Sequence, residues 1–584
     1  MLTRMLFAAG LACAGLVLAD PGTPCAQASL PAPGQPILSA QARLLPVLAQ
    51  EGMVASQERH ASAVGVEILK RGGNAVDAAV ATGFALAVTL PRAGNLGGGG
   101  FMLVHLARSG ETIAIDYRET APAAATRDMF LDAKGEPDSV KSRDSGLSIG
   151  VPGTVRGLAL AHEKYGSGRF SLAQLLEPAV RLAREGIPVE DDLADSLLPA
   201  AARLARFPAS AAIFLKDGQP LRRGDRLVQS DLALTLEAIR QQGPDGFYAG
   251  RVAAEIAAAS RAAGGIMTEA DLAAYRPVIR PVLRGSYRGY EIRAMPPPSS
   301  GGVHLIQILN ILEGFDLAAS GAGAARTLHL LAEAMKPAYA DRAAFLGDPD
   351  RVTVPARGLT AKAYAQVLRA AIDPERARPA DAVAPGNPLP HEGDQTTHFS
   401  VIDREGNAVS NTYTLNFSYG MGMVAAGTGV LMNNELDDFA AKPGAQNAYG
   451  LVGGEANAVA AGARPLSSMT PVILLKDGRV VLVTGSPGGS RIITTVLQVV
   501  VNVIDFGMNI AEAIAAPRIH HQWKPDVLLV ERGLSPDTLA LLAQRGHQVR
   551  LGATSGSANS ILITPEGITG AADPRQRGTA AIGY

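Results

Sequence analysis

The chain has 584 residues, of which 18% are charged, and its 53 Lys and Arg residues nearly balance 54 Asp and Glu residues, for a formal net charge of -1. This balance excludes a strongly basic nucleic-acid-binding domain, because phosphate backbones are bound by clustered lysine and arginine side chains. Small, nearly neutral substrates fit this composition better than polyanions do.

The N-terminal segment has the pattern of an export signal. Arg4 precedes an apolar run over residues 5–19, and Ala26-Gln27-Ala28 offers a small-x-small cleavage site. The run is shorter than the ~20 residues of a membrane-spanning helix. We therefore predict that residues 1–28 are removed and that the mature protein is periplasmic or secreted, without a membrane span. A lipid anchor at Cys13 or Cys25 is the alternative.

Thiol and metal chemistry are not indicated in the mature chain. The whole sequence has only two cysteines, Cys13 and Cys25, and both lie in the predicted signal, so the mature chain has no thiolate nucleophile and no Cys-bound metal. The ten histidines show no metal-ligand spacing, and the serine-hydrolase elbow, zincin and P-loop motifs are all missing. We expect no metal and no cofactor, which leaves chemistry by hydroxyl groups and the backbone.

Predicted helices and hairpins alternate along the chain. Helices are expected over 59–71 and 75–90, with Gly72-Gly73 ending the first and Asn74 capping the second. Residues 152–280 and 325–375 have mainly the pattern of amphipathic helices, including 172–185 and 325–345. Pairs of apolar runs around Gly-containing turns predict four hairpins: 101–107 with 112–117, 398–402 with 408–415, 471–475 with 480–484, and 560–564 with 568–571. Distant hairpins separated by helical blocks indicate stacked antiparallel sheets covered by helices.

Thr396 stands where a linker rich in Pro, Asp and Gly, residues 376–395, meets the next predicted strand. A threonine at such a place is usually only a β-former. To act as a nucleophile it needs a base, and a free α-amine with a pKa of about 7.7–8 can serve. An internal threonine has no free amine, so this chemistry requires a cut between Gln395 and Thr396.

Three further polar segments are candidates. Gly488-Gly489 precedes a helix expected over 491–504 and can present backbone N–H groups to an oxyanion, although such a pair is more often a tight turn. Residues 433–439 and 464–469 are also polar, but their spacing alone does not pair them and is typical of loops.

Taken in order, these segments resemble the γ-glutamyltransferase family. The similar motifs are Thr396-Thr397-His398, residues 412–416, 433–439, 464–469 and 486–491, and the resemblance runs from about Met53 to the C-terminus. It implies an α+β fold, the four-layer αββα sandwich of N-terminal-nucleophile hydrolases, and a proenzyme that cleaves itself. A large subunit (29–395) and a small catalytic subunit (396–584) would stay together as a heterodimer.

The same resemblance implies roles for individual residues. Thr396 would take the acyl group from glutathione or another γ-glutamyl compound and pass it to water or to an amino acid or dipeptide acceptor. The supporting roles would be as follows: Thr414 bonds the Thr396 hydroxyl, Gly488 and Gly489 form the oxyanion hole, Arg118, Ser467 and Ser468 bind the substrate α-carboxylate, and Asn416, Glu435 and Asp438 bind its α-ammonium. Glu435 stands where bacterial relatives often have Gln. Residues 442–453, with Tyr449, resemble a lid loop that limits access of water.

Two alternatives stay open. A cephalosporin (glutaryl) acylase of the same superfamily would use the same nucleophile on a side chain without an α-ammonium. The presence of Asn416, Glu435, Asp438 and the lid loop argues against it. An uncleaved, secreted amino-acid-binding protein would keep only the pocket, and the intact set Thr396, Thr414 and Gly488-Gly489 argues against that protein.

Overall fold

The computed structural model describes residues 44–388, 399–552 and 556–584. Two seven-stranded sheets, in which all neighbouring strands are antiparallel, form its centre. The first has the order β1 (Val47–Ala49), β22 (Gly567–Ala571), β21 (Ser560–Thr564), β17 (Arg479–Thr484), β16 (Val472–Lys476), β11 (Tyr290–Ala294) and β10 (Leu283–Tyr287). The second has the order β23 (Ala580–Gly583), β2 (Met53–Ser56), β12 (Phe399–Ile402), β13 (Ala408–Thr414), β3 (Gly99–Leu106), β4 (Glu111–Tyr117) and β9 (Val278–Arg280).

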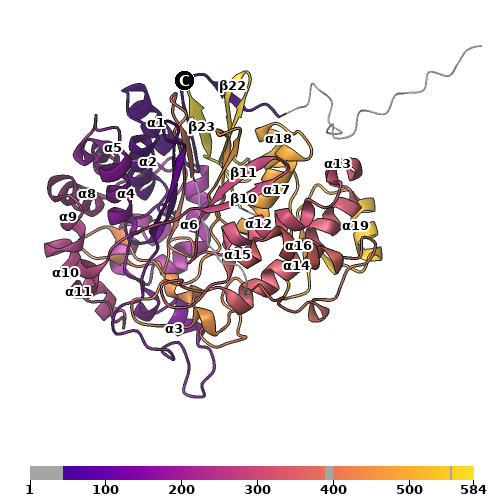
Figure 1. Ribbon diagram of the computed structural model, residues 1–584. Helices are drawn as coiled ribbons and strands as arrows, with labels where there is room; N and C mark the ends of the chain where they lie inside the picture. Colours follow the sequence, from indigo (N-terminus) through magenta and orange to yellow (C-terminus); the bar gives the residue numbers. More distant parts are fainter. Residues whose placement is uncertain (1–43, 389–398, 553–555) are drawn as a thin grey trace, which may run out of the picture.

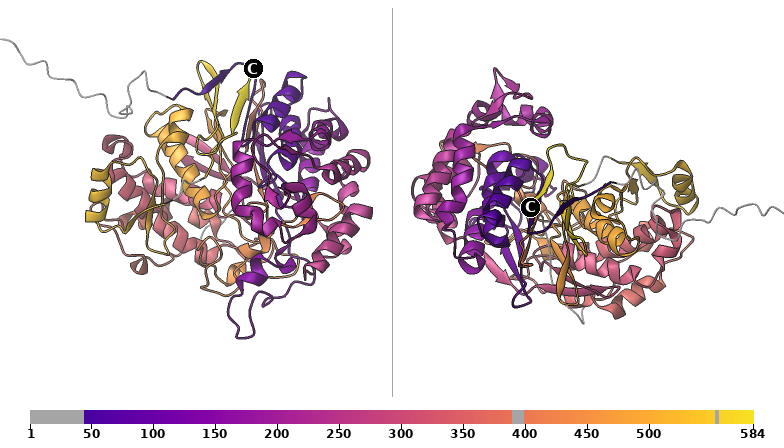
Figure 2. Two further views of the ribbon diagram at one scale, coloured as in Figure 1. Left: turned by 180° about the vertical axis from the view of Figure 1, so that it is seen from behind. Right: turned by 90° about the horizontal axis from the view of Figure 1, so that it is seen from above.

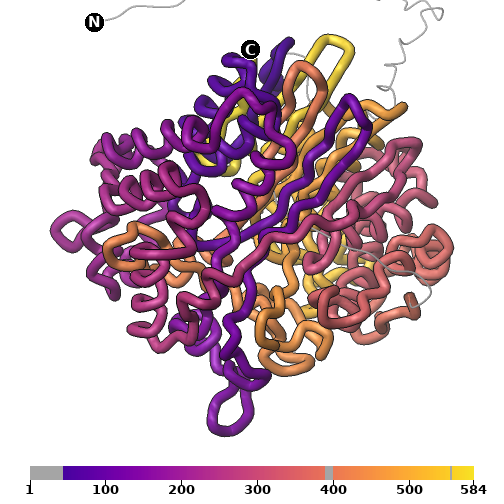
Figure 3. The backbone as a smooth tube through the Cα atoms, turned by 60° about the vertical axis from the view of Figure 1, so that its left-hand side comes forward, coloured from indigo at the N-terminus to yellow at the C-terminus, as the bar shows by residue number. Residues whose placement is uncertain are grey.

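All four predicted hairpins are confirmed, with ends that differ by one or two residues, while His398 of the second lies outside the described residues. Gly110 and Gly406 sit at two of the turns with φ of 68° and 86°, a conformation that costs glycine little. Pairing of β13 with β3 joins two of the hairpins side by side in one sheet (Figure 3). Both sheets therefore combine strands from before and after residue 396.

Helices cover the outer face of each sheet (Figures 1 and 2). Against the second sheet lie α1 (Arg59–Lys70), α2 (Ala75–Thr89), α4 (Thr154–Tyr165), with α5 (Leu172–Glu185) and α8 (Ser230–Gln242) outside them. Against the first sheet lie α12 (Gly301–Leu312), α17 (Ile492–Ile504) and α18 (Ile510–Ala515), with α14 (Ala325–Phe345) packed on α12. The order helix, sheet, sheet, helix is the predicted αββα sandwich.

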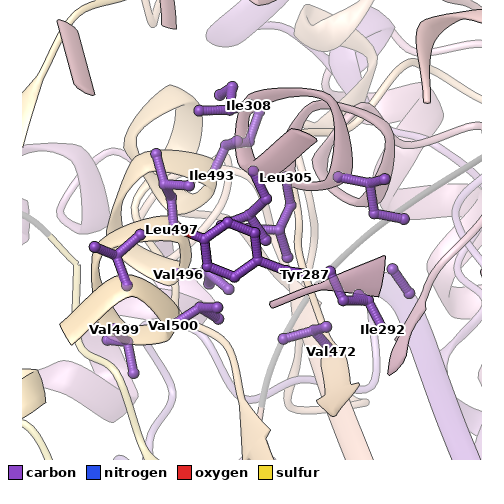
Figure 4. Packing of buried hydrophobic residues seen from close by; sticks show 14 of the residues in the cluster. Tyr287, Ile292, Leu305, Ile308, Val472, Ile493, Val496, Leu497, Val499 and Val500 are labelled. Atoms are coloured by element: carbon purple, nitrogen blue, oxygen red, sulfur yellow. The ribbon is translucent and has the colours of Figure 1, made fainter. Parts of the chain in front are cut away.

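Apolar side chains pack between the first sheet and the helices that cover it. Tyr287, Ile292 and Val472 project from the sheet toward Leu305 of α12 and Val496 of α17 (Figure 4). All five are buried, and full burial of an aliphatic side chain stabilises a fold by roughly 1.5–3 kcal/mol. This packing fixes α17, and with it the turn at Gly488-Gly489 that leads into the helix.

The prediction that residues 325–345 form an amphipathic helix is wrong in one respect. The helix α14 exists, but it is buried almost all round from Thr327 to Arg342. Its polar residues are paired inside the protein; Lys336 Nζ, for example, lies 2.7 Å from Glu333 Oε1. Burial of charge is tolerated when a partner is present, and a sequence pattern does not reveal that partner. The hairpin β10–β11 was also not among the predicted ones.

The predicted signal segment, residues 1–28 with Cys13 and Cys25, lies outside the described residues. Within the described ranges, no helix combines the length and the apolar character needed to cross a membrane.

Candidate active site

A cavity of about 310 Å³ gathers most of the predicted site residues. Its lining includes Thr414, Asn416, Glu435, Asp438, Tyr449, Ser467, Ser468, Gly488 and Gly489. These residues come from the end of β13, from the loops that follow it and from the turn before α17, so Thr414 and Gly489, which are 75 positions apart, meet at one place. Volumes of roughly 300–1,000 Å³ are typical of small-molecule sites. Gln395 and Thr396 lie outside the described residues, so their roles stay predictions.

Asn416 is held in one orientation at the cavity wall. Its φ is 74°, and its backbone N–H donates to Thr414 Oγ1 over 2.9 Å. The side-chain Nδ2 donates to the carbonyl oxygen of Asn434 over 2.9 Å. Among the described residues Oδ1 accepts no hydrogen bond, and a fixed amide oxygen of this kind suits a substrate ammonium.

Arg118 lies behind the cavity and is fully buried. Its guanidinium donates to Glu435 Oε1 and, over 2.7 Å, to Asp438 Oδ2, while Nε donates to the carbonyl oxygen of Pro465 over 3.1 Å. Arg118 does not line the cavity, and it pairs with the two carboxylates that were predicted to bind the ammonium. Direct contact between Arg118 and a substrate carboxylate would require these carboxylates to exchange partners, so that role stays a prediction.

The carboxyl groups around Arg118 outnumber the positive charges. Glu119 Oε2 is a third carboxylate oxygen, 3.9 Å from Arg118 Nη1. Burial raises the pKa of Glu119 to about 7, and burial also raises the pKa of Glu435 and of Asp438, although Arg118 opposes the shift in each case. Glu435 Oε2 has no hydrogen-bond partner in the described part of the chain. An added ammonium group would supply the missing positive charge.

Arg342 of α14 supports Ser468 of the cavity wall, a role that was not predicted. Its Nε donates to Ser300 Oγ over 2.8 Å, and Nη2 donates to Ser468 Oγ over 3.1 Å. Ser467 Oγ accepts the backbone N–H of Met469 over 3.3 Å. Neither serine hydroxyl donates to another described residue, so both can donate to a carboxylate. Nothing in the sequence distinguishes Arg342 from a surface arginine; only its buried position does.

Gly488 and Gly489 form a turn that leads into a helix and depends on glycine. The φ angles are 138° and 57°, in the left-handed region that favours glycine. Neither backbone N–H donates to another residue in the described ranges. Two unpaired N–H groups at the wall of a cavity are what an oxyanion hole requires.

Tyr449 closes the cavity from the loop 442–453. Its hydroxyl donates to the carbonyl oxygen of Asn416 over 2.8 Å, and its ring stacks on Phe417 with centroids 5.3 Å apart. The ring also packs directly on Gly489, where a Cβ would lie only 2.5 Å from it. The loop therefore packs against the Gly488-Gly489 turn and the wall of the cavity, and its action as a lid stays a prediction.

In the described ranges, no group of three or more His, Cys, Asp or Glu side chains is placed to hold a metal ion.

Residues 61–583 match the family model described as Gamma-glutamyltranspeptidase. The glutathione hydrolase proenzyme of Escherichia coli (strain K12) is 56% identical over 541 residues, which cover 92% of this chain and 93% of that protein. Among solved structures, the cephalosporin acylase from Bacillus halodurans superposes with a TM-score of 0.82 at 29% identity, covering 94% of this chain and 99% of that one. The Helicobacter pylori gamma-glutamyltranspeptidase gives a TM-score of 0.56 at 46% identity, over 59% of this chain and 97% of that one.

Proposed function

The chain belongs to the gamma-glutamyltranspeptidase family, and we propose that it is a self-processing γ-glutamyl acyltransferase and glutathione hydrolase. One observation carries this proposal: the carboxyl groups of Glu435 and Asp438, the hydroxyls of Ser467 and Ser468, and the Gly488-Gly489 turn line a single cavity. This set of groups can bind the α-ammonium and the α-carboxylate of a γ-glutamyl substrate and can stabilise an oxyanion nearby.

The substrate head is expected to bind by charge. Its α-ammonium joins Glu435, Asp438 and the free Oδ1 of Asn416, where the surrounding carboxyl groups lack a full set of positive partners. Its α-carboxylate accepts hydrogen bonds from Ser467 and Ser468, with Arg342 behind the second serine. A glutaryl side chain has no ammonium and would leave the carboxyl groups unneutralised. This argues against the acylase alternative, although a cephalosporin acylase shares the fold.

Thr396 supplies the nucleophile in this proposal, on the strength of its sequence motif. Its α-amine takes the hydroxyl proton while Oγ attacks the γ-carbonyl carbon, and the N–H groups of Gly488 and Gly489 stabilise the oxyanion. The C–N bond then breaks, and the leaving amine takes the proton from the α-amine. Water or an acceptor amine attacks the resulting ester, gives up a proton and releases Thr396 Oγ.

The proenzyme is expected to free this α-amine by an intramolecular acyl shift at the same hydroxyl. The Thr396 hydroxyl attacks the carbonyl of Gln395, the acyl group moves from nitrogen to oxygen, and water opens the ester. The products are a large subunit (29–395) and a small subunit (396–584). They are expected to stay together as a heterodimer, because both sheets take strands from each of them.

The proposal also covers the molecules that accept the acyl group and the location of the protein. Amino acids and dipeptides are the expected acceptor amines, with water as the competing acceptor. The signal pattern in residues 1–28 supports export to a periplasm or to the medium.

The intact mass of the purified protein under denaturing conditions tests the self-cleavage. Two fragments that meet at Gln395 and Thr396 are expected, and one persistent chain would overturn the proposal and favour a binding protein. Competition between γ-glutamyl and glutaryl p-nitroanilides then tests the substrate class. A preference for the γ-glutamyl compound is expected, and a glutaryl preference would establish the acylase alternative instead.

A further inference from the structure

We propose that Gln522 is a positioning residue that fastens the lid loop, residues 442–453, to the Gly488–Ser490 turn. By holding the loop down, it would bias the acyl-enzyme toward an acceptor amine and away from water. The inference rests on the proposed function and adds a determinant of its transfer-to-hydrolysis ratio.

Gln522 uses both ends of its side-chain amide. On the lid side, Nε2 donates to the carbonyl oxygens of Gly450 over 3.0 Å and of Tyr449 over 3.2 Å. On the other side, Oε1 accepts the hydroxyl of Ser490 over 2.8 Å and lies 2.9 Å from His520 Nε2. Ser490 directly follows Gly489, so one side chain bridges the lid and the turn predicted to form the oxyanion hole.

The surroundings leave Gln522 a single orientation. On the lid side, the carbonyl oxygens of Tyr449 and Gly450 can only accept hydrogen bonds. On the other side, the Ser490 hydroxyl donates to Oε1. The Gln522 amide group must therefore point its NH₂ at the lid.

The lid approaches Gln522 closely where it has no side chain. Gly450 has a φ of 71°, and a Cβ there would come within 3.1 Å of Gln522 Nε2. Other hydrogen bonds also hold the lid: Tyr449 bonds Asn416, Asn447 Nδ2 bonds Asp438 Oδ1 over 3.3 Å, the Ala448 N–H bonds Asp437 Oδ2 over 3.3 Å, and Lys442 Nζ bonds Glu136 over 2.8 Å. Without Gln522 the loop keeps these bonds and the packing of Tyr449 on Gly489 but loses its hydrogen-bonded link to Ser490. The loop can then open more easily and admit water beside the turn.

Gln522→Glu is the sharpest test, because it keeps the shape and the hydrogen bond accepted from Ser490. It changes the amide N–H side, where a carboxylate oxygen would face the carbonyl oxygens of Tyr449, Gly450 and, at 3.5 Å, Lys524. Gln522→Leu removes the hydrogen bonds on both sides and serves as the second variant. Gln219→Glu is the matched control: it makes the same chemical change in the exposed hairpin of β6 (Leu215–Lys216) and β7 (Gln219–Pro220), beside Lys216.

Each variant is first checked by mass for two chains, and p-nitroaniline release from γ-glutamyl-p-nitroanilide is then measured with and without glycylglycine. The transfer-to-hydrolysis ratio of Gln522→Glu is expected to fall about tenfold, the factor that corresponds to one or two lost amide–carbonyl hydrogen bonds. Release without acceptor should rise, because the opened loop admits water to the acyl-enzyme, while the stimulation by glycylglycine should fall. Gln219→Glu should match the wild type in both rates.

A wild-type ratio in both Gln522 variants would overturn the inference. Should neither variant yield two chains, Gly450→Ala, which pushes the lid off Gln522, must give the same fall in the ratio. A wild-type ratio there would equally overturn it. Failure of the proposed function looks different, because the wild-type enzyme itself would then release no p-nitroaniline.

Discussion

Gly489→Ala is expected to separate the turn from the lid that rests on it. The new Cβ would lie 2.5 Å from two carbons of the Tyr449 ring, whereas carbon atoms in contact are about 3.5–4.0 Å apart. The ring must therefore move by about 1 Å. Its hydroxyl bond to Asn416, 2.8 Å long, would then stretch beyond about 3.5 Å and be lost. A φ of 57° adds about 1–2 kcal/mol of backbone strain for alanine.

Hydrolysis of γ-glutamyl-p-nitroanilide by four proteins measures the effect: the wild type, each single variant and the double variant with Tyr449→Ala. The kcat/KM of Gly489→Ala should fall on the order of 100-fold, the loss that accompanies removal of one oxyanion-hole donor. In the Tyr449→Ala background the Cβ has room, so the same change should cost about tenfold less.

Gly488→Ala is the matched control for this cycle. Its φ of 138° is also strained for alanine, but its Cβ would meet no ring and would come no closer than 3.4 Å to Gly556. Its effect should therefore not depend on Tyr449. Equal costs of Gly489→Ala in the two backgrounds would refute the packing argument, and wild-type activity of Gly489→Ala would refute any role of the turn.

Three further outcomes are expected. Thr396→Ala should stay one inactive chain by mass, and normal cleavage in that variant would contradict the nucleophile assignment. The folded-state pKa of Glu119 is raised from 4.5 to about 7, so its stabilising contribution is complete below pH 4.5 and is lost as the pH rises through about 7. Relative to the wild type, the free energy of unfolding of Glu119→Gln should therefore increase by about 3 kcal/mol from pH 4.5 to above pH 7, measured by urea denaturation, and a flat difference would contradict this. Arg342→Lys keeps the charge but cannot bond both Ser300 and Ser468, so KM for the γ-glutamyl donor should rise about fivefold at constant kcat; a fall in kcat alone would argue against substrate binding there.

Hairpins and most helices were predictable because their determinants are local. Apolar runs around a glycine turn gave the pair β3–β4, and Asn74 forms the predicted cap of α2, with the Asp77 side chain returning the bond. In each case the residues that decide the structure lie within one or two turns of it. The order of the site motifs along the chain added the family, and with it the αββα sandwich.

The pairing of charges was not predictable in the same way. Arg118 and Glu435 are separated by 317 positions, and the sequence assigned them to opposite ends of the substrate. Whether a guanidinium faces solvent, a substrate or a carboxylate depends on which loops the sheets bring together. The helix α14 illustrates the same point. Its charged residues fit the pattern of a solvent-exposed helix face, whereas in the structure they are buried and paired, as Lys336 is with Glu333.

Most elements, the glycine turn and the residue types of the site were predictable, because each follows from short-range conformational preference or from a motif; the hairpin β10–β11 and the burial of α14 were not. The positions of Arg118 behind the cavity, of Arg342 behind Ser468 and of Gln522 between the loop and the turn follow only from the packing of distant segments. Burial and hydrogen bonding between distant segments exist only after the two sheets have stacked, since that packing sets which polar groups lose water and must find one another.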